Sequence, residues 1–149
     1  MKYVNKHAWS DLTDKVIGAC LEVHRTMGPA LLERIYVDCL CKEFDLRGIS
    51  YQREVEFPLL YKGNDLGSIR LDILVEDTLV LEIKAVSMIL PVFNAQLISY
   101  LKIANKPVGM LVNFHEFKLM DGCKVLFRDH IPKQLADHVY PESVPSRDK

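Results

Sequence analysis

The segment from residue 79 to residue 86 constrains the fold of this 149-residue chain more than any other stretch. Its sequence, LVLEIKAV, is apolar enough for the interior of a β-sheet, yet it carries an acid and a base two positions apart. Side chains at alternate positions of a strand share a face. Glu82 and Lys84 therefore project together, on the face opposite Leu81 and Ile83.

Asp72 lies on the preceding predicted strand, and its partner across the hairpin depends on the length of the turn. In an antiparallel pair the two facing positions add to a constant, so Asp72 faces Glu82 only if Val75 faces Leu79. The turn is then residues 76–78, an allowed three-residue loop, whereas a two-residue loop would bring Asp72 opposite a residue of the other face. In the first register the two Cβ atoms lie about 4.5–5.5 Å apart.

Two carboxylates at this separation repel each other unless a cation lies between them. Hard oxygen ligands of this kind suit Mg²⁺ or Mn²⁺, with water and a substrate phosphate in the remaining positions. The alternative interpretation is that Glu82 and Lys84 are ordinary polar positions on a half-exposed antiparallel sheet. Taken alone, the segment favours that ordinary interpretation, and other residues are needed to change the balance.

The remaining periodicities predict a single α/β domain with the element order α-α-β-β-β-α-β and a terminal β-hairpin. Ser10 is the predicted N-cap of the first helix and Gly48 the predicted C-terminal cap of the second. Pro58 interrupts the first strand, which indicates an edge strand. The predicted elements are helices over about 11–25, 31–47 and 91–104, strands over about 51–59, 66–75, 78–86 and 108–114, and a hairpin over 117–127 around Asp121-Gly122.

The composition is that of an ordinary globular domain, because 49% of residues are hydrophobic and 26% are charged. No apolar run is long enough to cross a membrane, and residues 1–7 lack the apolar stretch of a signal peptide, which favours the cytoplasm. We expect residues 1–140 to form the domain and residues 141–149 to be a flexible tail. The chain has a net charge of −1 and so lacks the surplus of basic residues that is usual in proteins that bind nucleic acid tightly through its phosphates.

Two predicted helices carry further polar pairs. Gln96 and Tyr100 are four residues apart, and Glu33 and Tyr36 are three apart, so each pair shares one helix face. Glu33 also lies near a helix N-terminus, where an acid is favourable because of the helix dipole alone. Tyr36 belongs to the apolar stripe of its helix, which favours a core position over a catalytic one.

Taken together, these residues resemble a known pattern. Residues 69–72 followed by residues 81–84 look like the D…ExK signature of PD-(D/E)XK nucleases, and residues 95–100 look like the Q-x-x-x-Y motif of the RecB-type branch. Residues 12–36 resemble the small GxxExxY family of that superfamily, and the resemblance as a whole spans roughly residues 11–125. Two positions depart from the pattern, since Ala30 replaces the glycine that names the family and Leu71 replaces a proline.

The resemblance implies a restriction-endonuclease-like fold, with an α-β-β-β-α-β core, an extra N-terminal helix and a C-terminal β-hairpin. It implies that Asp72 and Glu82 ligate Mg²⁺ or Mn²⁺ with help from the Ile83 carbonyl. Glu33 would join the metal shell directly or through water.

The same resemblance assigns roles to three more polar side chains. Lys84 would orient the attacking water or stabilise charge on the phosphate. Gln96 would orient the site, and Tyr100 would contact phosphate or support Lys84.

The four cysteines show no zinc-binding spacing and are expected to be free thiols. Some RecB-type nucleases hold an iron–sulfur cluster through cysteines near the C-terminus, but here only Cys123 lies beyond the core, so no cluster is expected.

The function that this pattern favours is metal-dependent hydrolysis of phosphodiester bonds in DNA, with RNA less favoured. The alternative is a nucleic-acid-binding or accessory subunit of a repair or defence complex that keeps the fold and turns over little substrate. The short chain also leaves room for a homo-oligomer or for a place in a larger complex.

Overall fold

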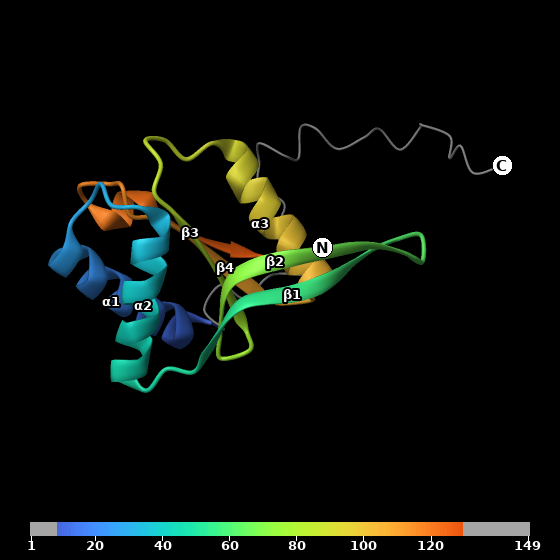
Figure 1. Cartoon of the computed structure of the whole chain (residues 1–149), viewed down its shortest axis with the longest axis horizontal. Helices are drawn as coiled ribbons and strands as arrows, with labels where there is room; N and C mark the ends of the chain where they lie inside the picture. The colour runs from blue at the N-terminus through green and yellow to red at the C-terminus, as the bar shows by residue number, and fades with distance from the viewer. Residues whose placement is uncertain (1–8, 130–149) are drawn as a thin grey trace.

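The computed structural model describes residues 9–129 and shows a twisted five-stranded sheet with helices on both faces (Figure 1). The predictions for the tail 141–149 and for a domain boundary at residue 140 lie outside the described residues. The elements are α1 (Ser10–Met27), α2 (Glu33–Arg47), β1 (Tyr51–Tyr61), β2 (Asn64–Val75), β3 (Leu79–Lys84), α3 (Pro91–Ala104), β4 (Val108–Asn113), a 3-10 turn η1 (Leu119–Gly122) and β5 (Cys123–Phe127).

The strands lie in the sheet in chain order, β1-β2-β3-β4-β5. Neighbours pair antiparallel except β3 and β4, which are parallel because the crossover helix α3 joins them. β1 is at the edge, which confirms the prediction made from Pro58. The predicted α/β fold class is confirmed, and the arrangement is consistent with a restriction-endonuclease-like fold.

Two apolar clusters hold the helices on the sheet. The larger lies between α1, α2 and one sheet face, where side chains such as Leu40 and Phe44 pack with Leu81 and Ile83. The smaller lies under α3 on the opposite face. β3 contributes to both clusters, because its alternate side chains point to opposite faces. No helix within residues 9–129 has the length and apolar character needed to cross a bilayer.

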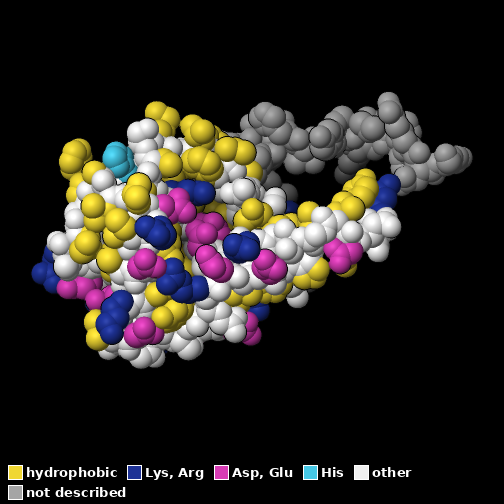
Figure 2. All heavy atoms as spheres, viewed as in Figure 1, with side chains coloured by type: hydrophobic (Ala, Val, Ile, Leu, Met, Phe, Trp, Pro, Cys, Tyr) yellow, Lys and Arg dark blue, Asp and Glu magenta, His cyan; other side chains and the backbone are white. Residues whose placement is uncertain are grey.

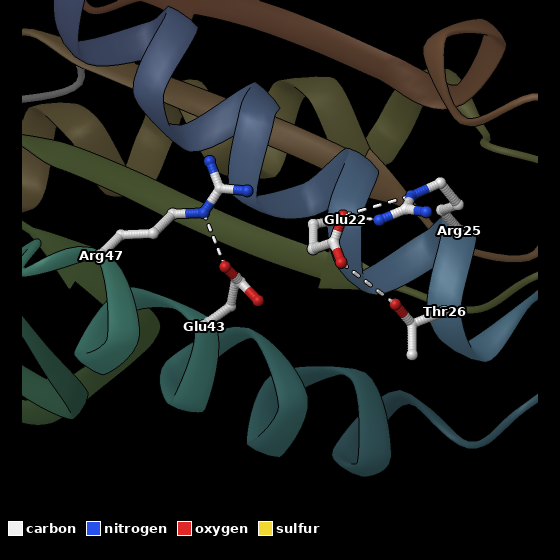
Figure 3. Close-up of polar contacts among 5 residues, drawn as sticks. All are labelled: Glu22, Arg25, Thr26, Glu43 and Arg47. Atoms are coloured by element: carbon white, nitrogen blue, oxygen red, sulfur yellow. Dashed lines mark hydrogen bonds and ion pairs between the residues drawn. The ribbon is translucent and has the colours of Figure 1, made fainter.

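The surface of the α1–α2 pair carries ion pairs within each helix (Figure 3). Arg25 pairs with Glu22 on α1, and Arg47 pairs with Glu43 on α2 at 2.6 Å. Arg47 also lies over Gly18 of α1, where an added Cβ would approach the guanidinium to 3.2 Å. Exposed ion pairs within a helix add little to stability, so these pairs support the individual helices more than the packing between them.

The observed helix ends agree with the predictions from the sequence in two cases and differ from them in two. Gly48 takes the left-handed conformation that caps α2, and α3 has the predicted bounds. The Ser10 N-cap is wrong: α1 begins at Ser10, Trp9 takes the cap position, and no side chain caps the helix. α2 begins two residues late, at Glu33, because Leu32 is extended.

The terminal hairpin predicted over residues 117–127 is also wrong. Only residues 123–127 of that stretch form a strand, and β5 pairs with β4, from Val108 opposite Phe127 to Val112 opposite Cys123. The Asp121-Gly122 turn belongs to η1, which buries Leu119 and seats Gly122 against β4. The backbone prefers this arrangement because β4 offers β5 a full set of hydrogen-bond partners and a buried face.

Ala30 has a φ of 74°, in the left-handed region that costs an L-residue about 1–2 kcal/mol. This is the position at which the resembling family carries glycine. The strain has a visible role, because it lets the chain turn between α1 and α2 before α2 begins.

We predict that Ala30→Gly raises the free energy of unfolding by about 0.5–1 kcal/mol, because glycine adopts this φ without steric cost. Urea denaturation followed by circular dichroism measures the change. The matched control is Ala95→Gly inside α3, which should lower stability by about 1 kcal/mol. A loss of stability in Ala30→Gly would contradict the assignment of strain at this residue.

Candidate functional site

The β2–β3 hairpin has the register that the candidate site requires. Val75 pairs with Leu79, and the pairing continues to Ile73 opposite Leu81. The next facing pair is therefore Asp72 and Glu82, and the loop is the three residues 76–78. The predicted register is confirmed.

At Asp72 the regular ladder gives way to hydrogen bonds with side chains. The backbone N–H of Ile83 donates to Asp72 Oδ2 at 3.0 Å, and the N–H of Asp72 points to Glu82 Oε1 at 3.5 Å. On the other side of β2, Glu54 is opposite Asp72 in the register and has a φ of 52°. Backbone irregularity of this kind clusters at functional sites, and here it surrounds one carboxylate.

Glu82 is buried beside this second acid, and its electrostatics reflect that position. Burial raises the pKa of Glu82 well above its ordinary value, and repulsion by Asp72 raises it further. Lys84 lowers the pKa but only partly offsets the other effects. The pair therefore lacks positive charge, which a bound cation would supply.

Lys84 and Tyr100 complete the part of the site that lies under α3. The Lys84 ammonium is 4.9 Å from the centre of the Phe93 ring, a cation–π contact that holds it at the start of α3. Burial raises the pKa of Tyr100, and the negative charges of Glu82 and Asp72 raise it further, so its hydroxyl lies near both acids. Gln96 is exposed one turn earlier on α3.

Glu33 approaches the same acids from the opposite side, at the first turn of α2. Partial loss of water raises the pKa of its otherwise exposed carboxyl, Asp72 adds to the rise, and Lys84 opposes it. The Glu33 carboxyl is thus close enough to Asp72 and Lys84 for their charges to change its pKa. The structure brings Glu33, Asp72, Glu82, Lys84 and Tyr100 into one neighbourhood.

Tyr36 fixes the turn that leads to Glu33. Its side chain is fully buried, which confirms its predicted core position, and it stacks on Phe114 with ring centres 4.6 Å apart. Its hydroxyl donates to the Gly28 carbonyl at 2.6 Å and accepts from the Leu31 N–H at 3.1 Å. The glutamate and the tyrosine three residues later are therefore linked through this turn.

Asn113 is a positioning residue that the sequence reasoning missed. It is fully buried at the end of β4, opposite Lys84. Its amide donates to the Val86 carbonyl at 2.8 Å, and its oxygen accepts from the N–H groups of Val86 at 3.0 Å and His115 at 3.3 Å. A polar residue that closes the apolar run 108–113 was the available signal.

The donor set fits a hard divalent cation with few protein ligands. Two carboxylates face each other, and Mg²⁺ is commonly held by one or two carboxylates with water and substrate phosphate completing the shell. Across residues 9–129 no three His, Cys, Asp or Glu side chains are clustered closely enough to hold a metal directly. The geometry therefore fits Asp72 and Glu82 as direct ligands and does not make Glu33 a third.

The chain belongs to the PD-(D/E)XK nuclease superfamily, since a model of that superfamily matches residues 10–126. Members of the superfamily are generally nucleases that act on nucleic acid and typically use divalent metals. Neither the curated proteins nor the solved structures gave a match.

We predict that Tyr36→Phe lowers the free energy of unfolding by about 1–3 kcal/mol, because the Gly28 carbonyl and Leu31 N–H lose a buried partner. Urea denaturation measures the loss. Tyr61→Phe, at an exposed residue of the β1 end, is the matched control and should change stability little. Equal stability of the Tyr36 variant and wild type would show that the hydroxyl bonds do not hold the turn.

We predict that Asp72→Asn raises the melting temperature in EDTA by about 3 °C, because it removes one of two adjacent carboxylates and keeps an oxygen acceptor for Ile83. With millimolar Mn²⁺ the order should reverse, since metal binding stabilises only the protein that holds the metal. Differential scanning calorimetry with and without Mn²⁺ reads both effects. A variant that gains as much from Mn²⁺ as wild type would place the metal elsewhere.

Proposed function

We propose that this chain is a metal-dependent nuclease that hydrolyses phosphodiester bonds in DNA. The observation that carries the proposal is the facing pair of carboxylates, Asp72 and Glu82, with Lys84 next on the same face of β3. Membership of the PD-(D/E)XK superfamily supports the same reaction.

Each residue has a role that follows from its place. Asp72 and Glu82 would hold Mg²⁺ or Mn²⁺ with the Ile83 carbonyl. When bound, the metal would lower the pKa of a coordinated water and neutralise charge on the phosphoryl oxygens. Lys84, fixed against Phe93, adds a positive charge close to the reacting phosphate without needing to reorganise.

Three further residues support the reaction in this proposal. Glu33 reaches the metal shell through a water, because it lies near Asp72 and is exposed at the helix start. Tyr100 contacts the phosphate or Lys84 from α3, and the exposed Gln96 orients substrate one turn away. We assign the chain to the GxxExxY group because Glu33 and Tyr36 are linked through the turn between α1 and α2.

A second candidate function has its own supporting observation. The net charge is −1, and acidic and basic side chains interleave over the face seen in Figure 2 without forming a broad basic patch. Little phosphate affinity is available from such a surface. An accessory subunit of a repair or defence complex, or a homo-oligomer that pools two surfaces, fits this charge distribution.

We predict that Lys84→Ala lowers the rate of Mg²⁺-dependent cleavage by about 10²–10³-fold, the usual cost of one preorganised charge. The assay compares single- and double-stranded DNA and RNA, with EDTA as the metal-free reference. Lys42→Ala, at an exposed lysine of α2, is the control and should cleave as wild type does.

Unchanged cleavage in a folded Lys84→Ala protein would refute the role of Lys84. Salt-dependent binding without cleavage in any divalent metal would favour the accessory function. Faster cleavage of RNA than of DNA would show that RNA is the preferred substrate.

A further inference from the structure

A hollow of about 290 Å³ lies beside the C-terminal ends of the parallel strands β3 and β4. Three segments that are distant in the sequence form its walls: the α1–α2 turn, the segment after β3 and the segment after β4. Its lining residues are Pro29, Ala30, Ser87, His115, Glu116 and Phe117.

Phe117 is the unusual member of this set. Its side chain is 95% exposed, more than any other large hydrophobic residue in the described part of the chain. A single exposed apolar residue needs no explanation by itself. Here, however, the ring borders a hollow whose walls are all held in place by hydrogen bonds from buried or half-buried groups.

The segment before Phe117 is fixed on both sides. The N–H of Phe114 donates to the Lys84 carbonyl at 2.9 Å, and the Glu116 carbonyl lies 2.7 Å from Nε2 of His24 on α1. The Glu116 side chain packs so closely on Gly122 that an added Cβ there would lie 2.7 Å from Glu116 Cγ. The exposed ring is therefore presented by a held backbone and not by a free loop.

The other walls are fixed by the residues that also order the site. Asn113 binds both backbone groups of Val86, directly before Ser87, and also binds the N–H of His115. Tyr36 binds the turn on either side of Pro29 and Ala30. The hollow is thus preformed, which is typical of small-ligand sites.

The hollow is close to the reacting groups along the chain. Ser87 is three residues after Lys84, and Ala30 is three residues before Glu33. Three residues span at most about 10 Å. Because this is a short distance, a group bound in the hollow would be a near neighbour of a phosphate at Lys84.

Charge decides what kind of group the hollow suits. The net charge of −1, and the interleaved charges on the face seen in Figure 2, favour a source of affinity other than phosphate contacts. Stacking of a base on an aromatic ring supplies such affinity without basic residues. His115 and Lys118, both exposed and within two residues of Phe117 in the chain, are suited to the adjoining phosphate, while Glu116 lines the hollow and packs its Cγ on Gly122.

We propose that this hollow binds a base of single-stranded nucleic acid, which stacks on Phe117 beside the phosphate held at Lys84. The inference rests on the proposed function for the identity of the ligand, and it names the substrate class: unpaired strands, in which a base is free to leave its neighbours. A paired duplex keeps its bases stacked and cannot offer one to the ring.

The experiment measures binding and needs no cleavage. Fluorescence anisotropy in EDTA compares a labelled single-stranded oligodeoxynucleotide with an abasic oligonucleotide of equal length, which keeps the phosphates and lacks the bases. Wild type should bind the strand with bases about tenfold more tightly. Phe117→Ala should abolish that preference, Phe117→Trp should keep it, and Phe117→Leu should lose most of it because a branched aliphatic side chain cannot stack.

Met88→Ala is the matched control, since Met88 is also exposed and apolar but does not line the hollow. It should bind both strands as wild type does. Equal affinity of wild type for the two strands, or an unchanged preference in Phe117→Ala, would overturn the proposal.

The two proposals fail separately. A protein that prefers the strand with bases through Phe117 but cleaves nothing in any metal would lose the nuclease function and keep the base site. A protein that cleaves DNA equally well with Phe117→Ala, and binds abasic strands as tightly, would keep the nuclease function and lose the base site.

Discussion

Two carboxylates, Asp72 and Glu82, face each other across the β2–β3 hairpin at a place where burial opposes charge. A buried acid beside another acid is unfavourable unless hydrogen bonds and a cation compensate. The Ile83 N–H provides one of those hydrogen bonds, and Lys84 provides nearby positive charge that is directed partly to Phe93. The rest of the architecture keeps this pair together: the three-residue turn sets the register, and α3 covers the sheet face on which both acids lie.

Buried polar bonds then position what surrounds the pair. Tyr36 ties the α1–α2 turn and so places Glu33 at the start of α2, while Asn113 ties the segment after β3 to the segment after β4. Both residues are fully buried. Their bonds lie in the interior, where an unpaired polar group is costly. The same two residues therefore order Glu33, the lysine end of β3 and the hollow at Phe117.

The sequence predicted most of the fold and the centre of the site because those features depend on local patterns. Alternation within residues 79–86 placed Glu82 and Lys84 on one face, and the constant sum of facing positions led to Asp72. Features that depend on tertiary contacts could not be predicted from the sequence. The Asp121-Gly122 turn looked like a hairpin, but β4 offered β5 a better partner, and Ser10 was displaced as N-cap by one residue. The role of Asn113 depends on two loops that meet only in the folded chain.

We propose that Asp72 and Glu82 together hold one divalent metal. Anomalous diffraction from crystals grown with Mn²⁺ tests it directly. We expect a single strong peak between the two carboxylates, about 2.1 Å from an oxygen of each, with any contact to Glu33 made through water. A peak bound elsewhere, or no peak at an Mn²⁺ concentration that supports cleavage, would contradict it.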